Sequence, residues 1–432
     1  MKVLASWLLA TGVALPMAWA LVSATTQALD AAAWQALWAD PQTLRAWCMT
    51  LWTGLTSTVL VWLTLARLLA SGFIRQQLAR WLAHVPAMLA TPHAAMAMGL
   101  VLWLAPSGWA LRLVSPGLTG LQAPPLWTTT QDPWGLGLIL ALWVKEVPFL
   151  VWVAATQLQR EDLRRRWQAE YVLAQTLNRT PVQAFAQVVW PQLAPRLRWP
   201  ALAVLAYGLT VVDMALIIGP ATPPTLAVLA WQWLGDADAA MQAQGAAAAA
   251  LLTLSVAVLA AALSFPPVQE RFWVKATGAA LQVMAGQVKS GQRVGAGPSG
   301  GLHGSLGWWL IAGLYLAVWW ALAVGSVSGV WPFPQLWPTR WTGDAWAQVV
   351  LSADTVWTTL GLALASASLC LVWVVVWLEL STRRWQKMLR PWLLLPLVLP
   401  SVLWVVGLYS LALQWRLEGQ WLGLLLAHVV MV

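Results

Sequence analysis

Long apolar runs separated by short polar segments dominate the chain. A membrane-spanning helix needs about 20 consecutive, mainly apolar residues. Nine runs meet that requirement, and a tenth extends from Trp421 to Val432. The nine complete runs are residues 3–23, 48–70, 85–105, 135–157, 199–219, 245–265, 307–329, 356–378 and 391–413. The pattern predicts an all-α fold, a polytopic transmembrane helical bundle.

The composition supports a lipid bilayer as the surroundings of the chain. Of its 432 residues, 60% are hydrophobic and 9% are charged. A typical soluble domain has about 25% charged residues. A water-soluble fold of this composition would leave large apolar patches uncovered, and such patches aggregate. Soluble enzymes, intrinsically disordered proteins and nucleic-acid binders are therefore excluded.

The placement of lysine and arginine predicts the orientation of the spans. If the N-terminus lies inside, the cytoplasmic segments hold nineteen of the 24 basic residues. They are Lys2, Arg67, Arg75, Arg80, Arg160, Arg164, Arg165, Arg166, Arg179, Arg196, Arg198, Arg271, Lys275, Lys289, Arg293, Arg383, Arg384, Lys387 and Arg390. Cytoplasmic loops of membrane proteins carry such an excess. We therefore expect a multi-pass protein of the bacterial inner membrane with a cytoplasmic N-terminus.

The first apolar run has two interpretations. Met1-Lys2, the apolar stretch and Ala18-Trp19-Ala20 fit a cleaved signal peptide. The apolar run continues through Leu21-Val22, which is long for a signal core and favours an uncleaved membrane anchor.

The chain contains an internal repeat. Thr50–Leu69 followed by Val85–Leu104 resembles Thr355–Leu378 followed by Leu393–Leu413. In each case a span and a short basic loop precede a span that contains prolines. Duplicated bundles are common in transporters. The alternative is that apolar spans simply look alike, although here their order and spacing also agree.

A hydrophilic segment, residues 267–306, separates the two repeats. Its tail, Gly291–Gly307, has seven glycines in 17 residues and is expected to be flexible. The sequence therefore divides into a first half at 1–266, a cytoplasmic Gly-rich linker at 267–306, and a second half at 307–432.

The long cytoplasmic loop 158–198 predicts a helical hairpin. Asn178 tolerates the left-handed conformation that ends a helix. Thr180 suits the N-cap, Pro181 suits the first helical position and Gln183 completes a capping box. The second helix is expected to present an apolar face that includes Phe185 and to end before Pro191. An amphipathic hairpin between two spans is typical of a docking element.

This segment resembles the EAA loop of ABC importer permeases, which docks into an ATP-binding subunit. The similarity runs over about 20 residues, and Val172 and Asn178 stand where the family has Glu and Gly. Asn can adopt the turn that Gly adopts, whereas the missing Glu removes a possible ATPase contact. The positions that the resemblance assigns to ATPase docking are Val172, Ala174, Leu177, Asn178, Thr180, Gln183, Ala184, Phe185 and Pro191.

The resemblance continues through Val211–Pro220, Pro223–Val228 and Trp231–Leu234, and it is strongest to the fused, two-half permeases of thiamine transport systems. It implies cytoplasmic ATPase subunits and a periplasmic substrate-binding protein as partners, with thiamine as a candidate substrate. Those relatives have about twelve spans and a second EAA-like loop. Because the sequence ends within the tenth span, we expect it to be C-terminally incomplete, or completed by another chain.

Three ionisable residues fall inside predicted spans, namely Lys145, Glu146 and Asp213. Such groups are costly in hydrocarbon and usually face a bundle interior or water. One interpretation places them on the translocation path, where the carboxylates would favour a cationic substrate. The other makes them structural ion pairs, with separate partners for Lys145 and Glu146 because adjacent residues point in different directions. His93 is expected to be a hydrogen-bonded packing residue.

No enzyme motif is found. The chain lacks the G-x-x-x-x-G-K-[ST] phosphate loop, so ATP hydrolysis is assigned to partner subunits, and it also lacks H-E-x-x-H and G-x-S-x-G. The histidines form no cluster with metal-ligand spacing, and no cofactor is expected. Two alternatives stay open, an ion-coupled secondary transporter that uses Glu146 and Asp213, and a polytopic membrane enzyme.

Overall fold

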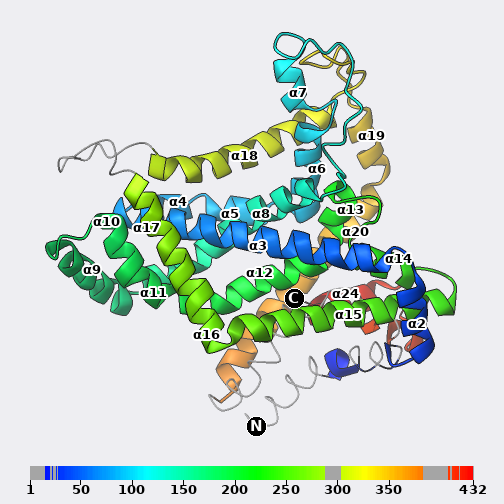
Figure 1. The fold of residues 1–432 in the computed structure, drawn as a ribbon. Coiled ribbons are helices and arrows are strands. Elements are labelled where there is room, and N and C mark those ends of the chain that lie inside the picture. The colour runs from blue at the N-terminus through cyan, green and yellow to red at the C-terminus, as the bar shows by residue number, and fades with distance from the viewer. Residues whose placement is uncertain are drawn as a thin grey trace.

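The computed structural model describes residues 15–19, 22, 26, 28–287, 303–382, 407–408, 411–417 and 419–431. These residues form helices joined by turns and loops (Figure 1). Apart from an isolated bridge between Ser328 and Trp341, the described part of the chain has no β-structure. The predicted all-α fold is confirmed. The predicted span 3–23 lies mostly outside the described residues, as do the span 391–413 and the tail Gly291–Gly307.

Six described helical segments are long and apolar enough to cross a bilayer. They are Thr43–Ile74 (α3), His93–Val114 (α6 and α7), Leu136–Gln159 (α8), Ala239–Ser264 (α15), Leu306–Ser326 (within α18, His303–Ser326) and Ala353–Leu380 (α20). The shorter segments include α2 (Ala31–Ala39), α4 (Leu78–Leu82), α14 (Leu226–Leu234), α19 (Asp344–Leu351) and α24 (Trp421–Met431).

The predicted span 85–105 is not one helix. It forms α5 (Val85–Ala90) and α6 (His93–Leu104), with Thr91 and Pro92 extended between them. Pro92 has no N–H to donate, and its ring disfavours a helical conformation at the preceding residue. A prediction that only counts apolar residues treats Pro86 and Pro92 as ordinary span residues and so misses the break.

The predicted span 199–219 is also divided. Helix α12 (Arg198–Thr210) ends at Val211, whose backbone is extended, and α13 (Asp213–Ile218) begins directly after Val212. No proline lies at this break. Asp213 is the first residue of α13, where a carboxylate is favoured by the partial positive charge of a helix N-terminus. Asp213 is therefore at a helix start and not inside a continuous span.

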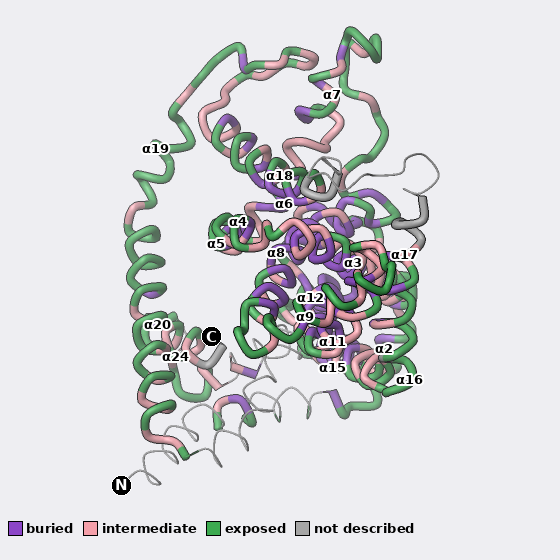
Figure 2. Tube along the Cα trace, turned by 90° about the vertical axis from the view of Figure 1, so that its left-hand side faces the viewer, coloured by how far each residue is buried: buried purple, intermediate pink, exposed green. Residues whose placement is uncertain are grey.

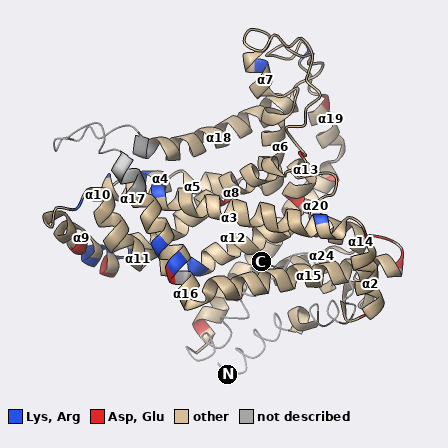
Figure 3. Ribbon diagram, in the orientation of Figure 1, with Lys and Arg blue, Asp and Glu red and all other residues tan. Residues whose placement is uncertain are grey.

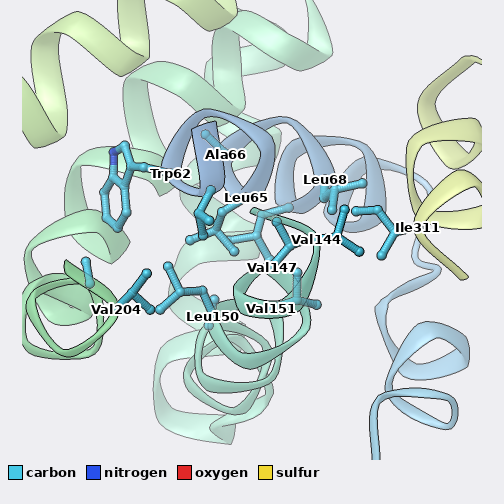
Figure 4. Close-up of a cluster of buried hydrophobic side chains, with 14 of the residues drawn as sticks. Trp62, Leu65, Ala66, Leu68, Val144, Val147, Leu150, Val151, Val204 and Ile311 are labelled. Atoms are coloured by element: carbon cyan, nitrogen blue, oxygen red, sulfur yellow. The ribbon is translucent and has the colours of Figure 1, made fainter. Parts of the chain in front are cut away.

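The core of the bundle lies between α3, α8, α12 and α18. Figure 4 shows Trp62 and Leu65 of α3 beside Val147 and Leu150 of α8, with Val204 of α12 close by. In the most apolar stretch of α8, 72% of the residues are buried in the protein, whereas in that of α20 only 11% are buried. Helix α8 is thus the central element, and α20 runs beside α24 away from the main bundle (Figure 2).

The segment that the sequence assigns to a flexible linker starts as helix. Helices α16 (Pro266–Val268), η3 (Gln269–Ala276) and α17 (Thr277–Gln287) follow α15 without a long loop. Trp273 is 1% exposed and Leu281 is 3% exposed, so this segment is packed against the bundle. Two buried apolar side chains thus anchor the first part of a stretch that is hydrophilic on average.

Candidate functional sites

The hairpin consists of α9 (Glu161–Thr176), a tight turn and a second helical stretch. Asn178 has the left-handed backbone, with φ of 61°. The main-chain N–H of Gln183 donates to Oγ1 of Thr180 (3.3 Å). The main-chain N–H of Thr180 donates in return to the side-chain Oε1 of Gln183 (3.1 Å). The left-handed turn and the capping box predicted from the sequence are confirmed.

The second helical stretch does not end before Pro191. It continues through α10 (Pro181–Ala184), the π-helical turn η1 (Phe185–Val189), α11 (Trp190–Leu193) and η2 (Ala194–Leu197) into α12. A π-helical turn holds one more residue than an α-helical turn. The wider turn before Pro191 accommodates the proline ring, so the helix continues. The hairpin is consequently joined to α12 without a loop.

The apolar face of the second helical stretch is covered by the chain itself. Ala184, Phe185 and Val189 are fully buried. The ring of Phe185 lies 5.6 Å from that of Phe73 in α3, and Phe73 also contacts Tyr171 of α9 at 5.3 Å between ring centroids. Ala184 and Phe185 thus belong to the interior of the hairpin and do not present a surface to a partner.

An open apolar groove lies on the other side, between α9 and the second helical stretch. It has a volume of about 380 Å³ and is lined by Glu170, Leu173, Ala174, Leu177, Gln187, Val188, Pro191 and Gln192. At its edge the exposed fractions are 55% for Val172, 62% for Leu173 and 70% for Leu177. We call this feature the hairpin groove. It contains three of the predicted docking positions, Ala174, Leu177 and Pro191.

The other predicted docking positions are distributed differently. Val172 is exposed beside the groove, Asn178, Thr180 and Gln183 form the turn and its cap, and Ala184 and Phe185 are buried. The docking positions predicted from the sequence do not include Leu173, Val188 and Gln192. The spacing of Glu170, Leu173 and Leu177 along one face of α9 is the signal that could have found Leu173.

Polar side chains fix α9 against α11 at the groove. Glu170 accepts hydrogen bonds from Nε of Arg166 (2.7 Å) and from Nε2 of Gln192 (2.7 Å). The indole of buried Trp167 donates to Oε1 of Gln192 at 2.9 Å. The hydrogen bonds from Arg166 and Gln192 hold the pKa of Glu170 below its ordinary value. The hairpin is a fixed unit in which the two helices keep one spacing.

A tryptophan cluster attaches the hairpin to the bundle. The ring of Trp62 in α3 lies 4.4 Å from that of Trp273 in η3 and 5.3 Å from that of Trp190 in α11. Trp62 Nε1 also donates to Oγ1 of Thr277 at 3.0 Å. Basic residues surround this end of the molecule, near α9, α10 and α16 (Figure 3). The hairpin, the helical segment 266–287 and the positive charge lie at one end of the bundle.

Within the membrane-spanning part, Lys145 has a structural role. Its ammonium donates to the main-chain carbonyls of Met88 (3.2 Å), Leu89 (3.4 Å) and Thr91 (2.7 Å). These carbonyls lie at the C-terminal end of α5, where no helical amide follows and where a cation is favoured. Lys145 is 4% exposed, and its ammonium supplies the donor for the carbonyls at the break in the predicted span 85–105.

Glu146 and Asp213 belong to a separate polar cluster. Oε1 of Glu146 lies 3.6 Å from Nε2 of His93, whose ring is 4.7 Å from that of Tyr207. The Tyr207 hydroxyl in turn donates to Oδ1 of Asp213 at 3.4 Å. No ion pair joins Lys145 to either carboxylate among the described residues. The sequence did not indicate Tyr207, because its proximity to His93 depends on how the two divided spans pack.

Known proteins identify the family. The chain is 30% identical over 426 residues to the inner membrane ABC transporter permease protein YnjC of Escherichia coli (strain K12). The aligned region is 99% of this chain and 73% of that protein. This chain belongs to the inner membrane ABC transporter permeases. No protein-family model and no solved structure matches it.

As an ABC permease, the chain is a transporter subunit and a multi-pass protein of the inner membrane. ABC permeases in general work with ATPase and binding-protein partners. The two structural features described above, the hairpin groove and the polar cluster, are therefore the regions of this permease to consider for partner and solute contacts.

Proposed function

We propose that this permease forms the translocation pathway of an importer and that its hairpin groove binds the ATPase subunit. A periplasmic binding protein would deliver the solute, and thiamine is the candidate that the sequence resemblance implies. The two-half organisation and a cytoplasmic N-terminus belong to the same proposal. The observation that carries it is the open apolar groove at the basic end of the bundle.

Exposed apolar side chains on a charged helix require an explanation. Helix α9 carries Glu161, Arg164 and Arg165 on its solvated surface, yet Leu173 and Leu177 are also largely exposed. Apolar patches bordered by polar residues mark interaction sites. The groove beside Leu173 has the shape that accepts a helix or loop of a partner. Its position next to the arginines of α9 supports a cytoplasmic partner, because basic loops stay in the cytoplasm.

The connection to α12 supplies a route for coupling. Helical structure runs from Pro181 to Thr210 without a loop, and the break at Val211 follows immediately. A displacement of the hairpin by the ATPase would therefore move α12 as a rigid arm. The end of this arm carries Tyr207, which contacts His93 and Asp213. Motion at the groove would thus reach the polar cluster directly.

The test is co-purification of this permease with a co-expressed ABC ATPase subunit from the same organism. Leu173→Asp and Leu177→Asp each place a charge at the rim of the groove, and we expect each to abolish co-purification of the ATPase. Gln168→Asp is the matched control, because Gln168 is exposed on the opposite face of the same helix. Undiminished co-purification of both groove variants would refute docking at this groove.

Topology is tested separately. A reporter fused at Arg165 should report cytoplasm. A reporter fused at Leu126, which is fully exposed in the long loop after α7 (Trp109–Val114), should report periplasm. A periplasmic signal from Arg165 would exclude contact between the hairpin and a cytoplasmic ATPase.

A further inference from the structure

The polar cluster lies where two divided helices meet a central one. Glu146 is the eleventh residue of the 24-residue helix α8 and so lies about 15 Å from its start, near the middle of the span. His93 is the first residue of α6, and Asp213 is the first residue of α13. Discontinuous helices near the bilayer midplane occur where transporters bind their solutes, because irregular backbone is tolerated there only beside protein or a water-filled cavity.

Glu146 lacks a hydrogen-bond partner. The residue is 9% exposed, and in the described part of the chain no hydrogen bond reaches its carboxylate. The contact it forms, with Nε2 of His93, is 3.6 Å long and exceeds an ordinary hydrogen bond. A largely buried carboxylate that forms no hydrogen bond with the described residues is incompletely compensated. A further hydrogen-bond donor or a cation beside His93 would therefore stabilise the Glu146 carboxylate.

The charges of the region do not balance. Lys145 is the nearest lysine in the sequence, and three main-chain carbonyls of α5 already occupy its ammonium. Glu146 and Asp213 are two carboxyl groups and Lys145 is one amine, so the three residues include one more acidic group than basic groups. Asp213 is exposed at the surface of the cluster, which leaves a path by which a compensating cation can approach.

The surroundings favour an organic cation over a metal ion. The described residues gather no group of three metal-ligating side chains. The cluster instead combines two carboxylates with the rings of His93 and Tyr207, which lie 4.7 Å apart. Aromatic faces beside negative charge are the arrangement that recognises ammonium groups, including quaternary ones.

We propose that His93, Glu146, Tyr207 and Asp213 form a membrane-embedded subsite for an organic cationic group of the transported solute. This proposal rests on the proposed function, since it takes the cluster to be part of the solute pathway. Glu146 and Asp213 supply the charge, Tyr207 supplies an aromatic face, and Lys145 holds the break in the neighbouring span so that His93 faces the carboxylates.

The experiment measures the thermal unfolding midpoint of the full chain in lipid nanodiscs. The probe is choline chloride, and its neutral isostere 3,3-dimethyl-1-butanol is compared in sodium chloride at equal ionic strength. A ligand that binds only the folded state raises the midpoint in a saturable manner. We expect this rise with choline and neither with the isostere nor with sodium chloride alone.

Variants locate the effect. Glu146→Gln and Asp213→Asn keep the side-chain size and should each abolish the choline-dependent rise. Tyr207→Leu should weaken it strongly, whereas Tyr207→Phe, which keeps the ring, should retain most of it. Glu161→Gln is the control, because Glu161 is an exposed carboxylate on α9. Variants whose midpoint without ligand matches that of the natural chain are compared, so loss of folding is not mistaken for loss of binding.

Three results would overturn the proposal. An equal rise with sodium or potassium chloride would assign the site to inorganic ions. A rise that persists in both carboxylate variants would place the choline elsewhere. No rise in the natural chain would mean that the cluster does not bind an organic cation. None of these results affects ATPase co-purification, so failure of the subsite and failure of the hairpin groove are distinguishable.

Discussion

The indole Nε1 of Trp190 donates a hydrogen bond to the main-chain carbonyl of Trp273 at 3.2 Å. This bond joins α11 of the hairpin to η3, a segment that the sequence assigns to a linker. Trp273 is 1% exposed, and its own indole donates to the Leu263 carbonyl at 3.2 Å. The segment 266–287 therefore acts as a brace that holds the hairpin against α3.

Removing the brace contact should loosen the hairpin. Trp273→Ala deletes a buried ring from the cluster with Trp62 and Trp190, and such truncations cost about 3–5 kcal/mol. We expect a lower thermal midpoint and faster proteolytic cleavage within residues 158–198. Phe272→Ala is the control, because Phe272 is 37% exposed and should matter much less. Equal effects of the two substitutions would show that the tryptophan cluster is not the anchor.

Lys145 should contribute to the stability of the fold and not to solute binding. Lys145→Met keeps the length of the side chain but leaves the carbonyls of Met88, Leu89 and Thr91 without their donor. An unsatisfied buried polar group costs about 1–3 kcal/mol. The midpoint should fall, while any choline-dependent rise should remain. Lys275→Met is the control, since Lys275 forms an ion pair with Glu270 at the surface and such pairs contribute little. Loss of the choline response with an unchanged midpoint would place Lys145 in the solute pathway.

Asn178 should be replaceable by glycine but not by a β-branched residue. Its φ of 61° lies in the left-handed region, which costs a β-branched residue about 1–2 kcal/mol and costs glycine nothing. Asn178→Gly should preserve the hairpin and ATPase association, and Asn178→Val should weaken both. Circular dichroism and co-purification measure the two effects. If the valine variant behaves like the natural chain, the left-handed turn is not needed for docking.

Local sequence rules predicted the parts of the molecule that depend on local interactions. The spans of α3, α8 and α15 follow from unbroken apolar runs, and the cap at Thr180 follows from the Thr180–Gln183 spacing. The break at Val211 was missed because hydropathy does not report main-chain direction.

The candidate sites depend on packing between distant segments, which limits prediction further. The contact of His93 with Glu146 joins residues 53 positions apart, and the hydrogen bond of Trp62 to Thr277 joins residues 215 positions apart. An amphipathic pattern at Phe185 correctly indicates that one face is covered. It does not indicate whether a partner or the chain itself covers that face.

A substitution at Phe185 distinguishes burial of this face by the chain itself from burial by a partner. The residue is fully buried and lies against Phe73, so Phe185→Asp would place a charge in an apolar interior without a partner. A buried, uncompensated charge costs about 3–5 kcal/mol. We therefore expect a marked loss of folded protein and a lower thermal midpoint, with loss of ATPase association as a consequence. Phe185→Leu keeps the apolar character and should cost less than about 1.5 kcal/mol.

The comparison variant is Leu177→Asp, because Leu177 is 70% exposed at the rim of the hairpin groove. It should keep the midpoint of the natural chain and lose only the ATPase. The two substitutions thus introduce the same charge on either side of the hairpin, one into the interior and one into the groove. A Phe185→Asp protein that keeps its midpoint while losing the ATPase would mean that Phe185 itself contacts the ATPase, and the docking surface would then include the second helical stretch.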